Sequence, residues 1–116
     1  MKEITKIWET YRSSWSEIDS NLRANNLSKI MSADFQYKDP NIDLIGSKQL
    51  SDYMQEFQNQ FKGASFEITD FNIHHDSIMA NWNMIDSKNE VMVNGVDFAR
   101  FENGKLKQIT GFFKEN

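Results

Sequence analysis

Two aspartates lie on the apolar faces of predicted strands, where a charged side chain is unusual. Strand alternation places Asp39 on the same face as Phe35 and Tyr37. Within residues 91–101, Asp97 is the only charged residue among the odd-numbered positions, which share one face. Removal from water disfavours the ionised carboxyl and raises its pKa, so either acid could exchange a proton near neutral pH. If both side chains enter one pocket, the sequence predicts a site for acid–base chemistry.

Each acid also has a purely structural interpretation. Asp39 precedes Pro40, and an Asp-Pro turn can use the carboxylate to cap a backbone amide. Asp97 has no turn nearby, but it could be buried as an ion pair with Arg100 or with a histidine. Arg100 lies on the opposite strand face, which favours a pocket position for Asp97.

Composition limits the classes of protein to consider. The 116 residues are enough for one domain, which we expect to span residues 1–116. A net charge of −4 without a basic run argues against nucleic acid and anionic membranes as partners. The absence of cysteine excludes disulfides, thiolate zinc sites and cysteine nucleophiles. No signal peptide and no apolar stretch of about 20 residues is present, so we expect a cytoplasmic protein.

The elements that must position the acids are helices first and strands second. Apolar residues at spacings of three and four predict a helix from Ile4 to Leu22 that breaks near Asp19, the expected N-cap of a second helix. A third helix should begin after Ser47 and end at Gly63. The expected strands are 34–39, 66–74, 78–85, 90–101 and 105–113, with a loop at 41–46. This order indicates an α+β fold, in which a meander covered on one face curls into a cone.

Aromatic side chains should wall the interior of this cone. Core packing explains most of them, and those with a polar tip are the best candidates to face a ligand. His74 and His75 are adjacent, so only one can point inward, and their divergence argues against a metal site. The predicted ligand-binding set is Trp8, Trp15, Tyr37, Tyr53, Phe57, His74, Trp82, Met84, Phe101 and Phe112.

Several short motifs occur in a familiar order. Tyr37-x-Asp39-Pro40 ends the first strand, Gly46 precedes the third helix, residues 97–101 read Asp-x-x-Arg-Phe, and Asn-Gly-Lys forms the last hairpin. From about Trp8 to Phe113, this order resembles the nuclear-transport-factor-2-like superfamily, and within it the SnoaL-like group related to polyketide cyclases and ketosteroid isomerases. The resemblance implies a cone-shaped, mostly antiparallel mixed sheet around a cavity that three helices close.

The resemblance to ketosteroid isomerases also implies roles for three residues. Asp39 matches the general base, Asp97 matches an acid that donates to an oxyanion, and Tyr11 matches the second oxyanion donor. The segment between Asp19 and the first strand is longer than in that pattern, so Trp8 or Trp15 could face the acids instead of Tyr11. No metal and no organic cofactor is implied.

The function predicted in this way is binding of a small hydrophobic carbonyl compound, with isomerase- or cyclase-type proton transfer as the chemistry. The alternative is a non-catalytic ligand-binding or dimeric interaction module of the same fold. The outer sheet face is unusually apolar, which predicts a homodimer through that face. The residues assigned to it are Met79, Ile85, Met92, Val96, Phe98 and Ile109.

Overall fold

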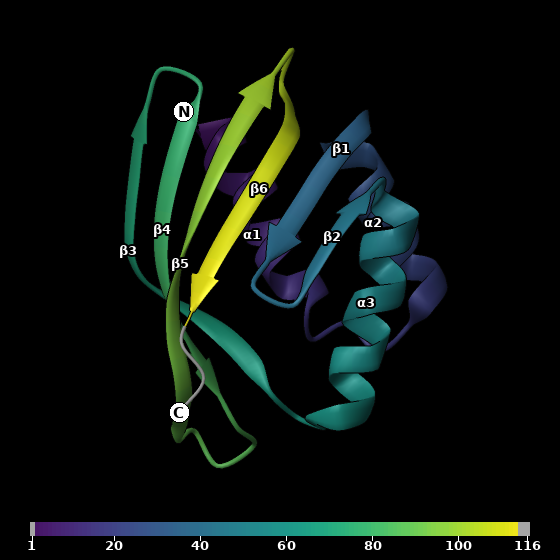
Figure 1. Cartoon of the computed structure of the whole chain (residues 1–116), viewed down its shortest axis with the longest axis vertical. Coiled ribbons are helices and arrows are strands. Elements are labelled where there is room, and N and C mark those ends of the chain that lie inside the picture. The colour runs from purple at the N-terminus through teal and green to yellow at the C-terminus, as the bar shows by residue number, and fades with distance from the viewer. Residues whose placement is uncertain (1, 114–116) are drawn as a thin grey trace.

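A computed structural model describes residues 2–113, which form three helices and one six-stranded sheet (Figure 1). The strand order is β2-β1-β6-β5-β4-β3, and β1 pairs with β6 in parallel while the other neighbours are antiparallel. The elements are α1 (Lys2–Ser14), α2 (Ser20–Ile30), β1 (Met31–Asp39), β2 (Ile42–Ile45), α3 (Ser47–Gln60), β3 (Ser65–His74), β4 (Ser77–Ile85), β5 (Val91–Glu102) and β6 (Lys105–Phe113).

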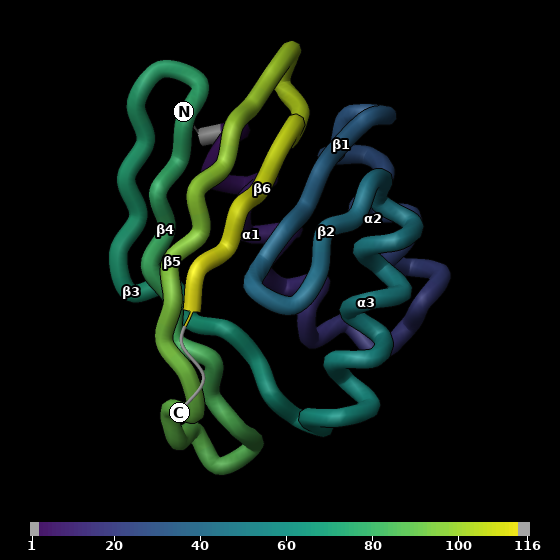
Figure 2. The backbone as a smooth tube through the Cα atoms, in the orientation of Figure 1, coloured from purple at the N-terminus to yellow at the C-terminus, as the bar shows by residue number. Residues whose placement is uncertain are grey.

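The sheet is strongly bent, and the helices lie on its concave side. Figure 2 traces β4 and β5 as long curved strands, with α1 passing behind them and α2 and α3 beside the β1–β2 pair. The core between these layers contains fully buried side chains from α2, α3, β1, β4 and β6, which confirms the expected α+β cone. Its largest fully buried apolar members are Leu27, Phe35, Leu50, Met54, Leu106 and Ile109.

The first predicted helix is shorter than its apolar stripe indicates. α1 ends at Ser14, and Ile18, which was expected on the buried stripe, is 83% exposed. The break occurs because Asp19 caps α2, and its carboxylate accepts hydrogen bonds from the backbone N–H groups of Asn21 and Leu22, both at 3.0 Å. The predicted cap is therefore confirmed, and the predicted end of the stripe is wrong.

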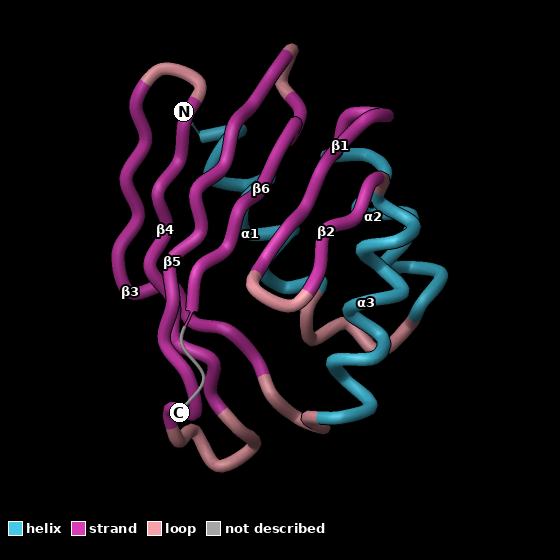
Figure 3. The backbone as a smooth tube through the Cα atoms, in the orientation of Figure 1, coloured by secondary structure: helices cyan, strands magenta, loops and turns pink. Residues whose placement is uncertain are grey.

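The segment expected to be a loop between residues 41 and 46 contains β2 instead (Figure 3). β2 pairs with β1, with Tyr37 opposite Leu44, and Leu44 is buried. β2 has four residues, too few to show a convincing alternation. Gly46, not Ser47, is the N-cap of α3, and its φ of 91° suits glycine.

Two bulges reverse the alternation of β3 and β6. Along β6, Leu106 pairs with Phe101 but Gln108 pairs with Arg100, so Lys107 is an extra residue. A one-residue slip exchanges the two faces of a strand. Ile109 is therefore fully buried and does not belong to the outer face to which the sequence assigned it.

The bulge in β3 has the same effect. Ile68 pairs with Trp82 and Asp70 with Asn81, so Thr69 is the extra residue. Beyond the bulge, the odd-numbered positions of β3 face the core and the even-numbered positions do not.

Among the described residues, no helix is long and apolar enough to cross a membrane.

Candidate ligand-binding and active site

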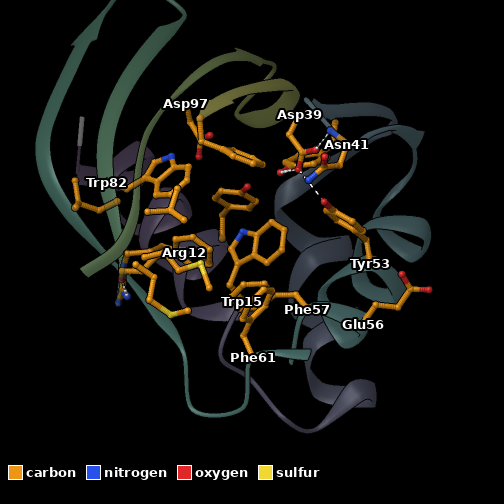
Figure 4. Close-up of a pocket in the computed structure, with 18 of the residues that line it drawn as sticks. Arg12, Trp15, Asp39, Asn41, Tyr53, Glu56, Phe57, Phe61, Trp82 and Asp97 are labelled. Atoms are coloured by element: carbon orange, nitrogen blue, oxygen red, sulfur yellow. Dashed lines mark hydrogen bonds between the residues drawn. The ribbon is translucent and has the colours of Figure 1, made fainter. Parts of the chain in front are cut away.

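A cavity of about 530 Å³ opens between the concave face of the sheet and helices α1 and α3 (Figure 4). Aromatic rings from both layers form most of its wall, and two aspartates reach it from the sheet. The lining residues are Trp8, Tyr11, Arg12, Trp15, Tyr37, Asp39, Asn41, Tyr53, Glu56, Phe57, Gln60, Phe61, Phe66, Ile68, Trp82, Met84, Met92, Val93, Asp97 and Phe113.

Asp39 ends β1 and is held in one orientation by three donors. Its Oδ2 accepts hydrogen bonds from the Tyr37 hydroxyl at 2.7 Å and from the Tyr53 hydroxyl at 3.1 Å. Its Oδ1 accepts the backbone N–H of Asn41 at 2.8 Å, in the turn to β2. The turn-capping interpretation is thus correct, yet the same carboxyl also lines the cavity. Burial raises the pKa of both tyrosines, which keeps them protonated as donors.

Asp97 projects from β5 into the same cavity, and β6 separates it from β1. Gly111 is the register partner of Asp97 on β6, and a methyl group there would lie 2.8 Å from Asp97 Oδ1 and 3.6 Å from Asp39 Cβ. The missing side chain at Gly111 therefore provides the space between the two acids. Asp39 on β1 and Asp97 on β5 are two strands apart in the sheet. At the usual distance between neighbouring strands, their α-carbons are about 10 Å apart.

Burial dominates the electrostatics of Asp97. The side chain is 8% exposed, and its burial raises the pKa of Asp97 to about 7. The indole of Trp82 partly offsets this rise in pKa, and the negative charge of Asp39 adds to it. Among residues 2–113, Asp97 has no ion-pair partner, so the alternative of a pair with Arg100 is wrong. Near neutral pH this carboxyl is available in both its protonated and its ionised form.

Tyr11 reaches the cavity from α1. Burial, followed by the negative charge of Asp97, raises the pKa of its phenol well above the usual range, so it remains a hydrogen-bond donor. Trp8 and Trp15 line the same wall, and Trp15 packs edge-on against Tyr11 with ring centroids 6.4 Å apart.

Seven of the other residues predicted for the site line the cavity: Trp8, Trp15, Tyr37, Tyr53, Phe57, Trp82 and Met84.

Three residues predicted to line the cavity lie elsewhere. His74 is exposed at the β3–β4 turn and Phe112 is 55% exposed on the outer face, because the bulges in β3 and β6 turn both side chains away from the interior. Phe101 is buried in the main hydrophobic core and does not line the cavity. It lies four residues beyond Asp97 along β5, roughly 13 Å at the usual rise of a strand.

Several residues at the cavity were not predicted from the sequence. Arg12 lies outside the apolar stripe of α1. It donates to the Phe66 carbonyl at 2.7 Å, forms an ion pair with Glu9, and forms part of the cavity wall. Gly95 and Gly111 lie within strands, where glycine often marks a close approach, and this signal was available in the sequence. Asn41, Glu56 and Gln60 add polar groups to the lining.

Within the described part of the chain, no three His, Asp or Glu side chains are grouped so that they could hold a metal ion.

A family model for the SnoaL-like domain matches residues 7–109, which include nearly every element around the cavity. The chain belongs to the SnoaL-like domain family. This assignment confirms the resemblance that the motifs indicated. No curated protein sequence matches the chain significantly.

Solved structures with the SnoaL-like fold superpose over most of the chain. One from Agrobacterium tumefaciens, described as a proposed isomerase of the SnoaL-like family, has a TM-score of 0.90 and 20% identity, covering 98% of this chain and 99% of that one. A proposed polyketide cyclase from Sinorhizobium meliloti has a TM-score of 0.75 and 12% identity over 91% and 93% of the two chains. A Catenulispora acidiphila protein with a ketosteroid isomerase-like fold, solved with trimethylamine, has a TM-score of 0.76 and 14% identity over 93% and 85%. At these identities, the similarity establishes the fold of this SnoaL-like protein.

Proposed function

We propose that this SnoaL-like protein binds a planar hydrophobic carbonyl compound and transfers a proton at the carbon next to the carbonyl. The observation that supports this proposal is the presence of two carboxyls with opposite environments in one aromatic cavity. Pairs of acids whose surroundings differ are suited to divided roles as base and acid. Asp39 is fixed by three donors, whereas burial favours the protonated form of Asp97.

The proposed reaction begins with the Asp39 carboxylate. It removes a proton from the carbon next to the carbonyl, and the C–H electron pair forms a C=C bond as the carbonyl π electrons move to oxygen. Protonated Asp97 and Tyr11 donate hydrogen bonds to the oxygen on which negative charge develops. Asp39 then returns its proton to carbon, at the original or a conjugated position. An isomerase and a cyclase differ in what the enolate attacks, and both would use this first step.

Deuterium exchange tests the proposal without knowledge of the natural substrate. 2-Tetralone, a planar bicyclic ketone with acidic protons next to its carbonyl, is incubated in D₂O with the wild-type protein, and exchange above the buffer rate is measured by NMR. Asp39→Asn should lower the protein-dependent rate by about 10²–10⁴-fold, the usual contribution of a general base.

The matched control for this exchange experiment is Asp43→Asn. Asp43 is an exposed acid on β2 whose carboxylate accepts a hydrogen bond from Gln36 Nε2 at 3.1 Å. Its substitution should leave the exchange rate unchanged. Absence of protein-dependent exchange, or equal rates for wild type and Asp39→Asn, would contradict the proposed chemistry.

A second proposal concerns the outer face of the sheet. We infer that this face pairs with a second copy of the chain. Such a dimer would also be the working unit if the protein is a non-catalytic interaction module. Its exposed apolar side chains include Met79, Phe98 and Phe112, which are 37%, 44% and 55% exposed. The rings of Phe98 and Phe112 meet edge to face with centroids 5.9 Å apart, so they form a continuous apolar surface.

A further inference from the structure

Trp82 occupies an unusual position against the neighbouring strand. Its register partner on β5 is Gly95, where a Cβ atom would lie 2.4 Å from Trp82 Cζ2 and 2.6 Å from the Phe112 carbonyl oxygen. Only a residue without a side chain allows the indole to lie this close to β5. Gly95 and Asp97 share one face of that strand, and Figure 4 shows the Trp82 nitrogen on the side of the ring toward Asp97.

The indole N–H of Trp82 is buried beside the Asp97 carboxyl, whose pKa it lowers, but it makes no well-formed hydrogen bond. Among the described residues, the Nε1 atoms of Trp82 and Trp8 are the two buried ring donors that make no hydrogen bond. Buried donors are nearly always paired, so an unpaired one beside a cavity needs an explanation. Trp82 is 8% exposed and lines the cavity, so an acceptor atom on a bound molecule can satisfy its N–H.

We propose that the Trp82 N–H donates, together with Asp97, to the oxygen of the ligand, and so makes Trp82 a specificity-determining residue of the site. The inference rests on the proposed function, because it requires that the cavity binds a carbonyl compound. A ligand that fills the cavity without an oxygen at this point displaces water and leaves the N–H unpaired. The cavity should therefore prefer a ketone to a hydrocarbon of the same shape by about tenfold, the usual effect of an unsatisfied buried donor.

Trp8 is the less suitable of the two unpaired indoles. It lies on α1, where its ring packs against Tyr11 at 4.9 Å and Phe71 at 6.3 Å between centroids. Trp82 lies beside the acid expected to bind the same oxygen, and its indole already influences the protonation of Asp97. This difference makes Trp8→Phe the natural control for Trp82→Phe.

The two donors are linked through the protonation of Asp97. When Asp97 carries its proton, both the O–H and the Trp82 N–H are available to a ligand oxygen. When Asp97 is ionised, its carboxylate competes for the N–H and repels the oxygen. Ketone binding should therefore weaken as Asp97 loses its proton. The titratable and charged groups that share the cavity with Asp97 are Tyr11 and Arg12 on α1, Tyr37 and Asp39 on β1, and Tyr53 and Glu56 on α3.

The test compares 2-tetralone with tetralin, which has the same skeleton without oxygen. Dissociation constants are measured by NMR titration of ¹⁵N-labelled wild type, Trp82→Phe and Trp8→Phe. Wild type should bind 2-tetralone about ten times more tightly than tetralin, and its Trp82 indole N–H signal should move downfield with the ketone only. Trp82→Phe should lose the preference for the ketone and still bind tetralin, whereas Trp8→Phe should keep that preference.

Three outcomes would overturn the inference. If both compounds bind wild type with equal affinity, or the Trp82 signal does not respond to the ketone, the cavity binds ligands but Trp82 is not the donor. If Trp8→Phe loses the preference for the ketone and Trp82→Phe keeps it, the donor to the ligand oxygen is Trp8. If neither compound binds, the proposed function fails together with the inference, and this result is distinct from the other two.

Discussion

The two faces of β5 and β6 contrast in a way that reverses the usual order of burial. On the concave face, Asp97 is only 8% exposed and lies beside Gly111. On the convex face, their chain neighbours Phe98 and Phe112 are 44% and 55% exposed. Acids are rarely buried without a partner, and aromatic rings contribute most when buried. The hydrophobic effect within a single copy explains neither the buried acid nor the exposed aromatic rings.

We propose that each face is completed by a partner outside the fold. A buried unpaired acid lowers stability, so its retention is explained if the cavity binds a ligand that uses its proton. An exposed aromatic surface is explained if a second copy covers it.

The largest effect should come from the inner face, with Asp97→Asn. The pKa of Asp97 is about 7 in the folded protein, against an ordinary value of 3.8. Between these values the folded state binds more protons than the unfolded state, so stability falls as pH rises and the full penalty applies above about pH 7. Asn does not titrate, so the variant should exceed wild type in free energy of unfolding by roughly 4 kcal/mol at alkaline pH, with a difference that shrinks toward pH 4.

Urea unfolding of wild type and Asp97→Asn at a series of pH values measures this difference. If the difference in free energy of unfolding between the two proteins does not depend on pH, Asp97 titrates normally in the folded protein. Burial of its charge would then not distinguish the inner face from the outer face.

On the outer face, Phe98→Lys should separate the proposed dimer. A charge in the centre of an apolar interface typically weakens association by about 2 kcal/mol or more, roughly 30-fold in the dissociation constant. Sedimentation equilibrium measures the change. Ile18→Lys is the control, because Ile18 is 83% exposed but lies on the turn between α1 and α2. A monomeric wild type, or equal association of both variants, would contradict the second-copy explanation of the outer face.

A smaller effect is expected from Gly111→Ala, which acts between the two acids. The added methyl group would lie 2.8 Å from Asp97 Oδ1, which is closer than carbon and oxygen normally approach. Overpacking of this kind lowers the free energy of unfolding by about 1–3 kcal/mol. It should also weaken 2-tetralone binding, since the carboxyl must move. A variant with the stability and affinity of wild type would show that the spacing of the acids is not constrained at Gly111.

Regular alternation allowed the sequence to predict much of the fold and the place of both acids. β4 and β5 keep their period of two through Trp82 and Asp97, so the inward face could be identified from residue types alone. The Asp19 cap could likewise be predicted, because it depends on local hydrogen bonds.

Side chains were predicted on the wrong face of the sheet where a bulge interrupts the alternation of a strand. The extra residues Thr69 and Lys107 exchange the faces of β3 and β6, and nothing in their residue types marks a bulge. His74, Ile109 and Phe112 were misplaced for this reason alone. The hydrogen bonds from Tyr37 and Tyr53 to one Asp39 oxygen depend on the packing of α3 against β1, which a sequence pattern does not define.

The dependence of 2-tetralone exchange on pH tests the division of labour between Asp39 and Asp97 most directly. If protonated Asp97 supports the reaction, the protein-dependent rate of wild type should fall as pH rises through about 7, where Asp97 loses its proton. Asp97→Asn should react more slowly and lack this fall, because its amide does not titrate. A wild-type rate that stays level or rises through this range, or a fall that persists in Asp97→Asn, would contradict the account.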